Sequence, residues 1–503
     1  MSEKLDRGAE IAKLARLLDR KPTELDYLER VPAWALRRFR EQATDKLYDS
    51  DGDRLRRVAA SSKLVPIPLT VQVVQKAIGP LGAAALSGLV DSDRAVKIAE
   101  KLPLDFLAEV AIDMDPRRST AVIAKMPPAT VAAVAETLIG KGEHVTMGRF
   151  VGFLPRASLE AAVKVIGDAD MLRTAFVLED KSRLNELAAI AENRLPGIVQ
   201  AAHENDLWGE ALDLLDHLDA TWQTKLGAVV AQQDHAVVDS LIHAAHRTQA
   251  FDSLLPATAV MSHDTLRSFA EANAVREEPV LREIVRVALA SNLWQALLPL
   301  AGVLPARSRE IVAARVAEEP DSAIEALADA AHTNRMWDSM LPIALGFTPE
   351  ARARLANLAL LQRSDVLTAI IEATARNDLW AELLPLADAL PAATRPHLAA
   401  CIGDLSREQM LAAVATAARS GNIPTLVEIA LHQSEDGRKR VLELIDSLDN
   451  VDEFVAALTP DTPQLVWDAL VGVKAEIPAA LADKLAQRAR ACGNPAIASA
   501  LIT

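Results

Sequence analysis

An aromatic side chain returns at a fixed interval of 43 residues through the C-terminal part of the 503-residue chain. A repeat of roughly 40 to 47 residues is typical of stacked units of two or three helices. One such unit cannot bury its own apolar face, so neighbouring units must stack to form a continuous core. The interval therefore predicts an α-solenoid with anchors at Trp208, Phe251, Trp294, Trp337 and Trp380, continued by Ile423 and, after a one-residue insertion, by Trp467.

Other residue types recur at fixed offsets from the anchor and predict a unit of three helices. Asn, Ser or Thr stands three residues before each anchor. These side chains can cap a helix N-terminus, so we expect a helix to start there. Proline five residues after four of the anchors predicts a short or bent helix. A further helix is expected to start eleven residues after the anchor, at residues common in caps and first turns, namely Asp219, Ser262, Pro305, Thr348 and Pro391.

The repeated aromatic residues have two possible roles. A row of indoles could stack on bases or sugars at a surface, or it could fill the core. Paired Leu residues stand beside most anchors, for example Leu297 and Leu298 after Trp294. Large aromatic side chains are mostly buried in such surroundings, so we expect core packing.

Composition supports an all-α fold and disfavours several functions. Half of the residues are apolar, and no alternating Val/Ile runs indicate a sheet. The net charge of −15 argues against a nucleic-acid partner. Two cysteines, Cys401 and Cys492, offer neither a disulfide framework nor metal-ligand spacing, which fits a reducing compartment. The start of the chain shows no secretory leader, so we expect a cytoplasmic protein.

The pattern divides the chain into four segments. Residues 1–62 are expected to be a polar helical head whose charges form a solvated face. Residues 63–90 form an apolar helical segment broken by Pro and Gly. Residues 91–200 form a superhelical region of short helices, and residues 201–503 form the regular repeat array with its C-terminal cap.

The segment Leu64–Val90 is the most apolar part of the chain, and its only formal charge is Lys76. Its length would nearly span a bilayer. Its prolines and glycines would leave broken backbone in hydrocarbon, so we expect two short core helices that seed the solenoid. The alternative is contact with a membrane surface, peripheral to its inner face.

Short amphipathic helices restarted by proline characterise residues 90–167, most visibly in DRAVKIAEKLPLDFLAEVAIDMDPRRSTAVIAKMPP. This sequence pattern resembles the superhelical N-terminal domain of MgtE-type magnesium transporters, while the later array resembles HEAT and armadillo repeats. The MgtE resemblance implies a superhelical shape. In that family the domain is a cytosolic regulatory module whose acidic surface helps to sense magnesium, so a module that responds to divalent ions is one alternative function.

Sequence signals for catalysis or a cofactor are absent. The chain has no P-loop, nucleotide-binding glycine motif, zinc-protease motif or nucleophile elbow. His235, Asp239 and His243 lie one helical turn apart and are the candidate ligands of a divalent metal. His397 and Cys401 have the spacing of a nucleophile pair. Both sets are more simply explained as ordinary helix residues.

A superhelix presents a long surface on which another protein's segment can bind. The leading hypothesis is a non-enzymatic cytoplasmic scaffold or adaptor for a protein partner. The alternatives are a peripheral membrane-organising protein that docks through residues 64–90 and the divalent-ion-responsive module. Oligomeric state, partner identity and the binding face stay open.

Overall fold

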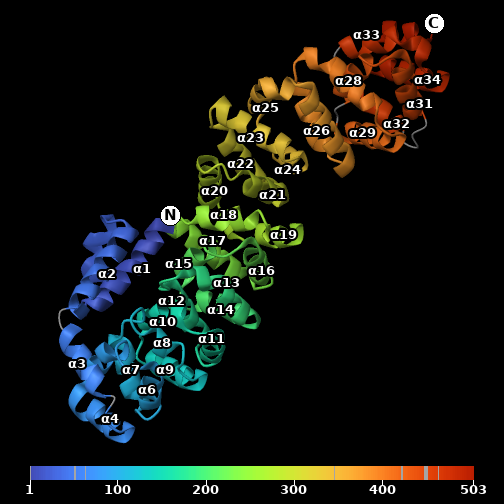
Figure 1. Cartoon of the computed structure of the whole chain (residues 1–503). Coiled ribbons are helices and arrows are strands. Elements are labelled where there is room, and N and C mark those ends of the chain that lie inside the picture. The colour runs from blue at the N-terminus through green and yellow to red at the C-terminus, as the bar shows by residue number, and fades with distance from the viewer. Residues whose placement is uncertain are drawn as a thin grey trace. The chain divides into compact units, whose positions relative to one another are not determined.

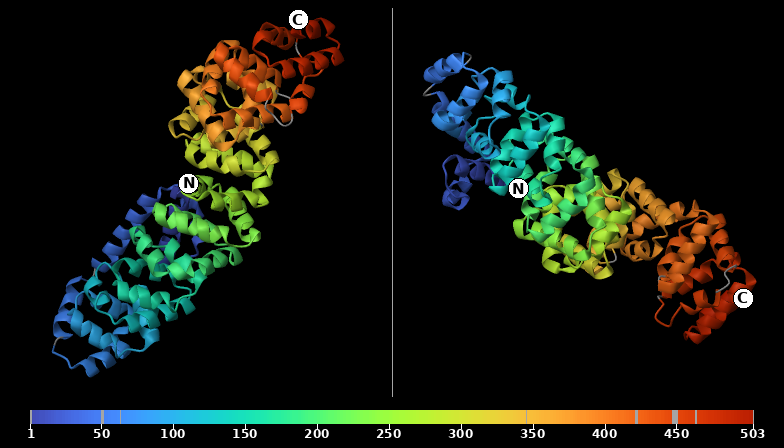
Figure 2. Two further views of the ribbon diagram at one scale, coloured as in Figure 1. Left: turned by 90° about the vertical axis from the view of Figure 1, so that its right-hand side faces the viewer. Right: turned by 90° about the horizontal axis from the view of Figure 1, so that it is seen from below.

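The computed structural model describes residues 2–49, 52–62, 64–344, 346–420, 423–446, 451–462 and 464–502. Within these ranges the chain forms thirty-five α-helices and no strand, which confirms the all-α fold class. The chain divides into two compact units, Met1–Thr265 and Leu266–Thr503. This boundary falls inside the array expected from residue 201 onward. Figure 1 labels the helices, and Figure 2 shows them from two other sides.

The first unit opens with three helices that we call the N-terminal strap: α1 (Ser2–Leu17), α2 (Ala33–Asp49) and α3 (Gly52–Ser62). Helix α1 contacts α10 and α15, and α3 contacts α5. The strap, drawn in blue, therefore packs against helices that come later in the chain (Figures 1 and 2). Ile11, Leu14 and Ala15 are the buried face of α1.

Short helices follow the strap, as the proline spacing predicts. Prolines begin or precede several of them because an N-terminal helix position needs no backbone donor. Their bounds are α4 (Ile67–Val73), α5 (Gly79–Ser87), α6 (Ser92–Ala99), α7 (Leu104–Asp113), α8 (Thr120–Ile123), α9 (Pro128–Gly140), α10 (His144–Phe150), α11 (Arg156–Val163), α12 (Asp168–Phe176), α13 (Leu184–Ile190) and α14 (Leu195–Glu204).

The anchor residue opens a helix in six successive 43-residue periods. These helices are short, and four of them contain the expected internal proline, although α15 is equally short without one. Within each unit they contact the next anchor helix along the chain. Trp467 instead lies inside its helix, α33 (Gln464–Gly472). The anchor helices are α15 (Trp208–Leu215), α18 (Phe251–Thr258), α21 (Trp294–Val303), α24 (Trp337–Ala344), α27 (Trp380–Ala389) and α30 (Ile423–Leu431).

Two further helices complete each period. The helix after the anchor helix starts directly after Asp219 and its equivalents in five periods, and Asp219 itself accepts a hydrogen bond from the backbone of Trp222 at 3.0 Å. After Pro391 a short 3₁₀ helix, Ala392–Thr394, precedes the α-helix. These second helices are α16 (Ala220–Ala231), α19 (His263–Glu271), α22 (Ala306–Ala317), α25 (Pro349–Ala356), α28 (Arg395–Gly403) and α31 (Glu435–Asp446). The third helices are α17 (His235–Thr248), α20 (Glu278–Ala290), α23 (Asp321–Thr333), α26 (Ser364–Asn377) and α29 (Arg407–Ser420), and the chain ends with α32 (Val451–Ala456), α33, α34 (Ala479–Ala491) and α35 (Pro495–Ile502).

The position three residues before the anchor ends a helix, so the expected helix start there is wrong. The amide of Asn205 donates to the Ala201 carbonyl at 2.9 Å, and that of Asn334 donates to the Ala330 carbonyl at 2.8 Å. Asn can cap either end of a helix, so residue type alone could not decide. The next residue leaves the helix through the left-handed region in five consecutive periods, at Asp206 (φ 52°), Gln249 (φ 58°), Asn292 (φ 55°), Arg335 (φ 56°) and Asp378 (φ 53°).

The aromatic anchors fill the core, which confirms the packing interpretation. None of the six aromatic anchors exceeds 8 % exposure, and Trp467 is fully buried. The indole of Trp208 also donates to the hydroxyl of Ser240 at 2.9 Å. The described helices are thus compatible with a helical repeat fold.

Candidate functional site

The three proposed metal ligands lie on α17, and the structure does not gather them into a metal site. His235 and His243 are exposed, and Asp239 is half-buried. Among the residues that the structure describes, no group of three or more His, Cys, Asp and Glu side chains could hold a metal ion. A divalent site at these positions stays a prediction without geometric support.

The structure brings His397 and Cys401 together on α28, with Nε2 at 3.5 Å from Sγ. The same Nε2 lies 2.9 Å from the carbonyl oxygen of Ser364. A carbonyl oxygen only accepts, so Nε2 must carry the proton in that contact. The imidazole nitrogen nearest the thiol is therefore no base for it, and the pair lacks the main requirement of an activated nucleophile.

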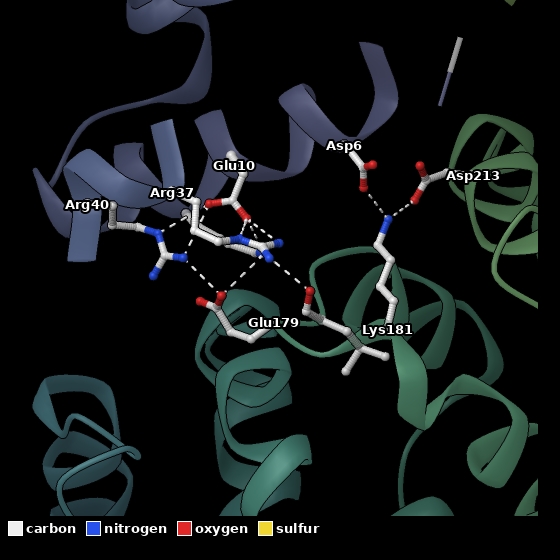
Figure 3. Close-up of polar contacts among 9 residues, drawn as sticks. Asp6, Glu10, Arg37, Arg40, Glu179, Lys181 and Asp213 are labelled. Atoms are coloured by element: carbon white, nitrogen blue, oxygen red, sulfur yellow. Dashed lines mark hydrogen bonds and ion pairs between the residues drawn. The ribbon is translucent and has the colours of Figure 1, made fainter. Parts of the chain in front are cut away.

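Buried charges hold the N-terminal strap to the rest of the first unit (Figure 3). Glu10, only 2 % exposed, accepts from Lys13 at 2.9 Å, from Arg37 at 3.1 Å and from Arg40 at 3.2 Å. Arg40 also pairs with Glu179 at 2.9 Å. Burial tends to raise the pKa of Glu10, but Lys13 and Arg40 outweigh it and hold that pKa below its ordinary value.

A second buried pair lies beside this cluster. Lys181 binds Asp6 of the strap at 2.8 Å and also pairs with Asp213 of α15. Asp213 has no exposed surface, and its Oδ1 has no hydrogen-bond partner. Burial raises the pKa of Asp213 above its ordinary value, although Lys181 lowers it in part.

Three more ion pairs continue along the strap. Arg16 pairs with Glu143 at 2.9 Å, and Asp45 of α2 accepts from Arg117 at 3.0 Å and from Arg118 at 3.3 Å. The expectation that the charges of residues 1–62 form a solvated face is therefore wrong for this network. Its partners outside the strap lie more than 70 residues away in sequence, so no local pattern could have revealed them.

An exposed apolar surface lies on α4, α5 and the residues around them. The chain is helical from Ile67 to Ser87, with a π-helical stretch between the two helices. The expected pair of helices is present, but only 28 % of the most apolar stretch is buried. The expectation that this segment forms core helices is therefore largely wrong. The exposed fractions are 89 % for Leu64, 53 % for Leu69, 46 % for Val73 and 68 % for Leu81.

Among the described residues, Ile67–Ser87 is one helical stretch with the length and apolar composition needed to cross a membrane. Its charge environment is one-sided. Between Asp53 and Asp91 the sequence contains no Asp or Glu, whereas it contains five cations in a chain of net charge −15. Arg54, Arg57 and Lys76 are exposed. We call this set of exposed apolar and basic residues on α3, α4 and α5 the apolar-basic surface.

An apolar channel of about 410 Å³ runs through the first unit and is partly open to solvent. Of its 51 described lining residues, twelve are alanine, four carry a hydroxyl and none is charged.

The cavities found in the second unit are smaller. Two cavities near its C-terminal helices measure about 50 and 10 Å³. The difference follows the sequence, because no Trp occurs between Trp34 and Trp208, whereas Trp294, Trp337, Trp380 and Trp467 all lie in the second unit. Sequence reasoning missed the channel, although the absence of Trp between Trp34 and Trp208 was a signal for it.

Comparison with known proteins gives no assignment. No known protein family matches this chain, and no curated protein is similar to it at a significant level. Functional inference therefore rests on the site geometry alone.

Proposed function

We propose that the protein is a peripheral membrane-organising protein whose first unit docks on an anionic lipid bilayer through the apolar-basic surface. The observation that carries this proposal is the exposure of large apolar side chains, led by Leu64 and Leu81, within a segment that has five cations and no acid. Apolar side chains enter the boundary between headgroups and acyl chains, while cations attract anionic headgroups. Neither feature alone would select an anionic bilayer over a protein partner.

Liposome flotation of the full chain tests the docking. The expected result is flotation with vesicles of phosphatidylcholine and phosphatidylglycerol, and weak or no flotation with phosphatidylcholine alone. Each cation near an anionic surface contributes about 1 kcal/mol, so the double variant Arg54→Glu/Arg57→Glu should bind at least about tenfold more weakly. A matched charge control is Arg490→Glu, at an exposed cation of the second unit.

The apolar contribution is tested separately with Leu69→Ser/Leu81→Ser, which should abolish flotation while leaving the folded protein intact, because both side chains are more than half exposed. Val165→Ser/Val260→Ser changes two other exposed apolar residues and should float normally. The proposal would be contradicted if Leu69→Ser/Leu81→Ser floated as well as Val165→Ser/Val260→Ser. It would also be contradicted if the unmodified protein did not float.

A second candidate function is a scaffold for a protein partner, formed by a solenoid of the 43-residue periods. It is favoured by the regular spacing of anchor helices α21, α24, α27, α30 and the contacts between successive members. Chemical crosslinking of the full chain in its native extract should then give partner crosslinks on the exposed sides of these periods. Crosslinks confined to the first unit would count against it.

Magnesium regulation, implied by the MgtE resemblance, stays a separate hypothesis. The measurement that tests it is the melting temperature of the full chain with and without millimolar magnesium. An unchanged melting temperature would remove this hypothesis.

A further inference from the structure

Successive helices of the first unit together form the wall of the channel. Its lining includes residues of every helix from α3 to α16, so it is elongated along the unit. Alanine occupies lining positions on many of these helices, including Ala99, Ala135, Ala162 and Ala188. The lining also contains fourteen leucines, so the void lies between branched apolar side chains and alanines that do not fill the space between the helices.

The size and lining of the channel indicate which class of ligand it can bind. Its volume of about 410 Å³ falls within the range of about 300 to 1,000 Å³ that small-molecule sites occupy. A lining drawn from consecutive helices fits an extended chain better than a compact ring system. Apolar cavities without polar partners stay dry, so water is a poor occupant.

Polar groups in the lining define the rest of the ligand. No described lining residue is charged, which excludes a buried ionic headgroup. Ser62 and Ser87 donate to helix carbonyls at 2.7 and 2.6 Å, and Thr70 donates to Pro66 at 3.1 Å. Thr174 on α12 is the exception, because its hydroxyl is buried without a hydrogen-bond partner and the residue is only 7 % exposed. A neutral acceptor on the ligand would satisfy it.

We infer that this channel binds one long-chain fatty acyl lipid, with the hydrocarbon chain along the apolar lining and its carbonyl accepting a hydrogen bond from Thr174. The lipid could come from a bilayer as a neutral acyl ester or from solution as a free fatty acid. A free fatty acid would bind in its protonated form, because an ionised carboxylate would have no charged partner in the channel. The inference does not require membrane docking, although α3 and α4 contribute to both the channel and the apolar-basic surface.

The experiment uses the full chain in vesicle-free buffer, so a failure of docking cannot produce a negative result. Fluorescence of cis-parinaric acid is titrated with the protein, and palmitic acid is used as the competitor. Saturable binding with displacement by palmitic acid is expected. Absence of saturable binding, after removal of any copurified lipid by delipidation, would overturn the inference.

Two alanines on α13 supply a matched pair of variants. Ala188 lines the channel, whereas its neighbour Ala189 is exposed and does not. Ala188→Phe should fill the void and weaken cis-parinaric acid binding at least tenfold, while Ala189→Phe binds normally. Circular dichroism checks that both variants are folded, and a folded Ala188→Phe variant with unchanged binding would contradict the assigned channel.

Thr174→Val separates ligand contact from a merely structural role. Removal of an unpartnered buried hydroxyl should raise the melting temperature of the delipidated protein, because that group is left unsatisfied without ligand. The same variant should bind palmitic acid roughly fivefold more weakly, which is the value of one ordinary hydrogen bond. Unchanged palmitic acid affinity would overturn the role of Thr174 in binding the carbonyl.

Discussion

Glu10 and its neighbours show how strongly single residues hold the N-terminal strap. Glu10 is buried among Lys13, Arg37 and Arg40, so Glu10→Gln leaves buried cations without their carboxylate. Loss of one partner from a buried ion pair costs about 3 to 5 kcal/mol. We expect the free energy of unfolding of the first unit, measured with urea, to fall by this amount.

The control is Glu160→Gln, whose ion pair with Arg156 is exposed and should contribute less than about 1 kcal/mol. The effect of Glu10 also depends on pH. Its pKa is lower in the folded state than the ordinary 4.5, so its stabilisation is present above that value and is lost as pH falls through the folded-state pKa. A pH profile of Glu10→Gln that parallels the unmodified protein in acid would contradict this role.

The pKa of Glu210 on α15 is shifted in the opposite direction from that of Glu10. Burial is the main cause that raises its pKa above 4.5 in the folded state. The unfolded chain ionises first as pH rises, so stability declines from the ordinary pKa up to the folded-state pKa, and the full penalty persists above it. Glu210→Gln should therefore stabilise the protein at pH 7 and have little effect near pH 4. Thermal unfolding at both pH values measures this difference, and destabilisation at pH 7 would refute it.

At the scale of elements, Gly148 allows α10 to approach the end of α12. A Cβ at this position would lie 2.7 Å from the carbonyl oxygen of Val177, which is backbone and cannot turn aside. Gly148→Ala should destabilise the first unit by about 1 to 3 kcal/mol, a typical cost of overpacking. Gly209 on α15 has open space, so Gly209→Ala should be neutral or stabilise by up to about 1 kcal/mol. Equal effects in urea unfolding would contradict this interpretation.

Two residues before five consecutive anchors, the backbone adopts a left-handed conformation that ends the preceding helix. Arg335 adopts φ 56°, a conformation in which a side chain with Cβ is strained by roughly 1 to 2 kcal/mol and Gly is not. Arg335→Gly should raise the stability of the second unit by a few tenths to about 1 kcal/mol, and Arg335→Val should lower it. Urea unfolding of the two variants should therefore give shifts of opposite sign. Shifts of the same sign would show that another contact of Arg335 decides stability.

At the scale of the whole molecule, the two compact units differ in how they are filled. The first contains the channel of about 410 Å³, while cavities in the second measure about 50 and 10 Å³. We expect two transitions in calorimetry, of which Glu10→Gln shifts the one that belongs to the first unit. Hydrogen exchange assigns the transitions to residues 1–265 or 266–503. A single transition shifted as a whole by this variant would show that the units unfold together.

The sequence by itself determined the helical class, the 43-residue placement of the helices and the burial of Trp294, Trp337 and Trp380. These features follow from local periodicity, because a helix that must bury one face repeats its apolar residues at helical spacing. Residue type near Asn205 was insufficient, since Asn caps either helix end.

Only the tertiary structure decided where distant residues meet. Lys13 contacts Leu178, and Arg16 contacts Glu143, across more than 120 residues of chain. The channel likewise arises from the space that apolar side chains on many separate helices leave together. Neither a distant ion pair nor a shared void has a local sequence period, because both depend on how helices pack after they have formed.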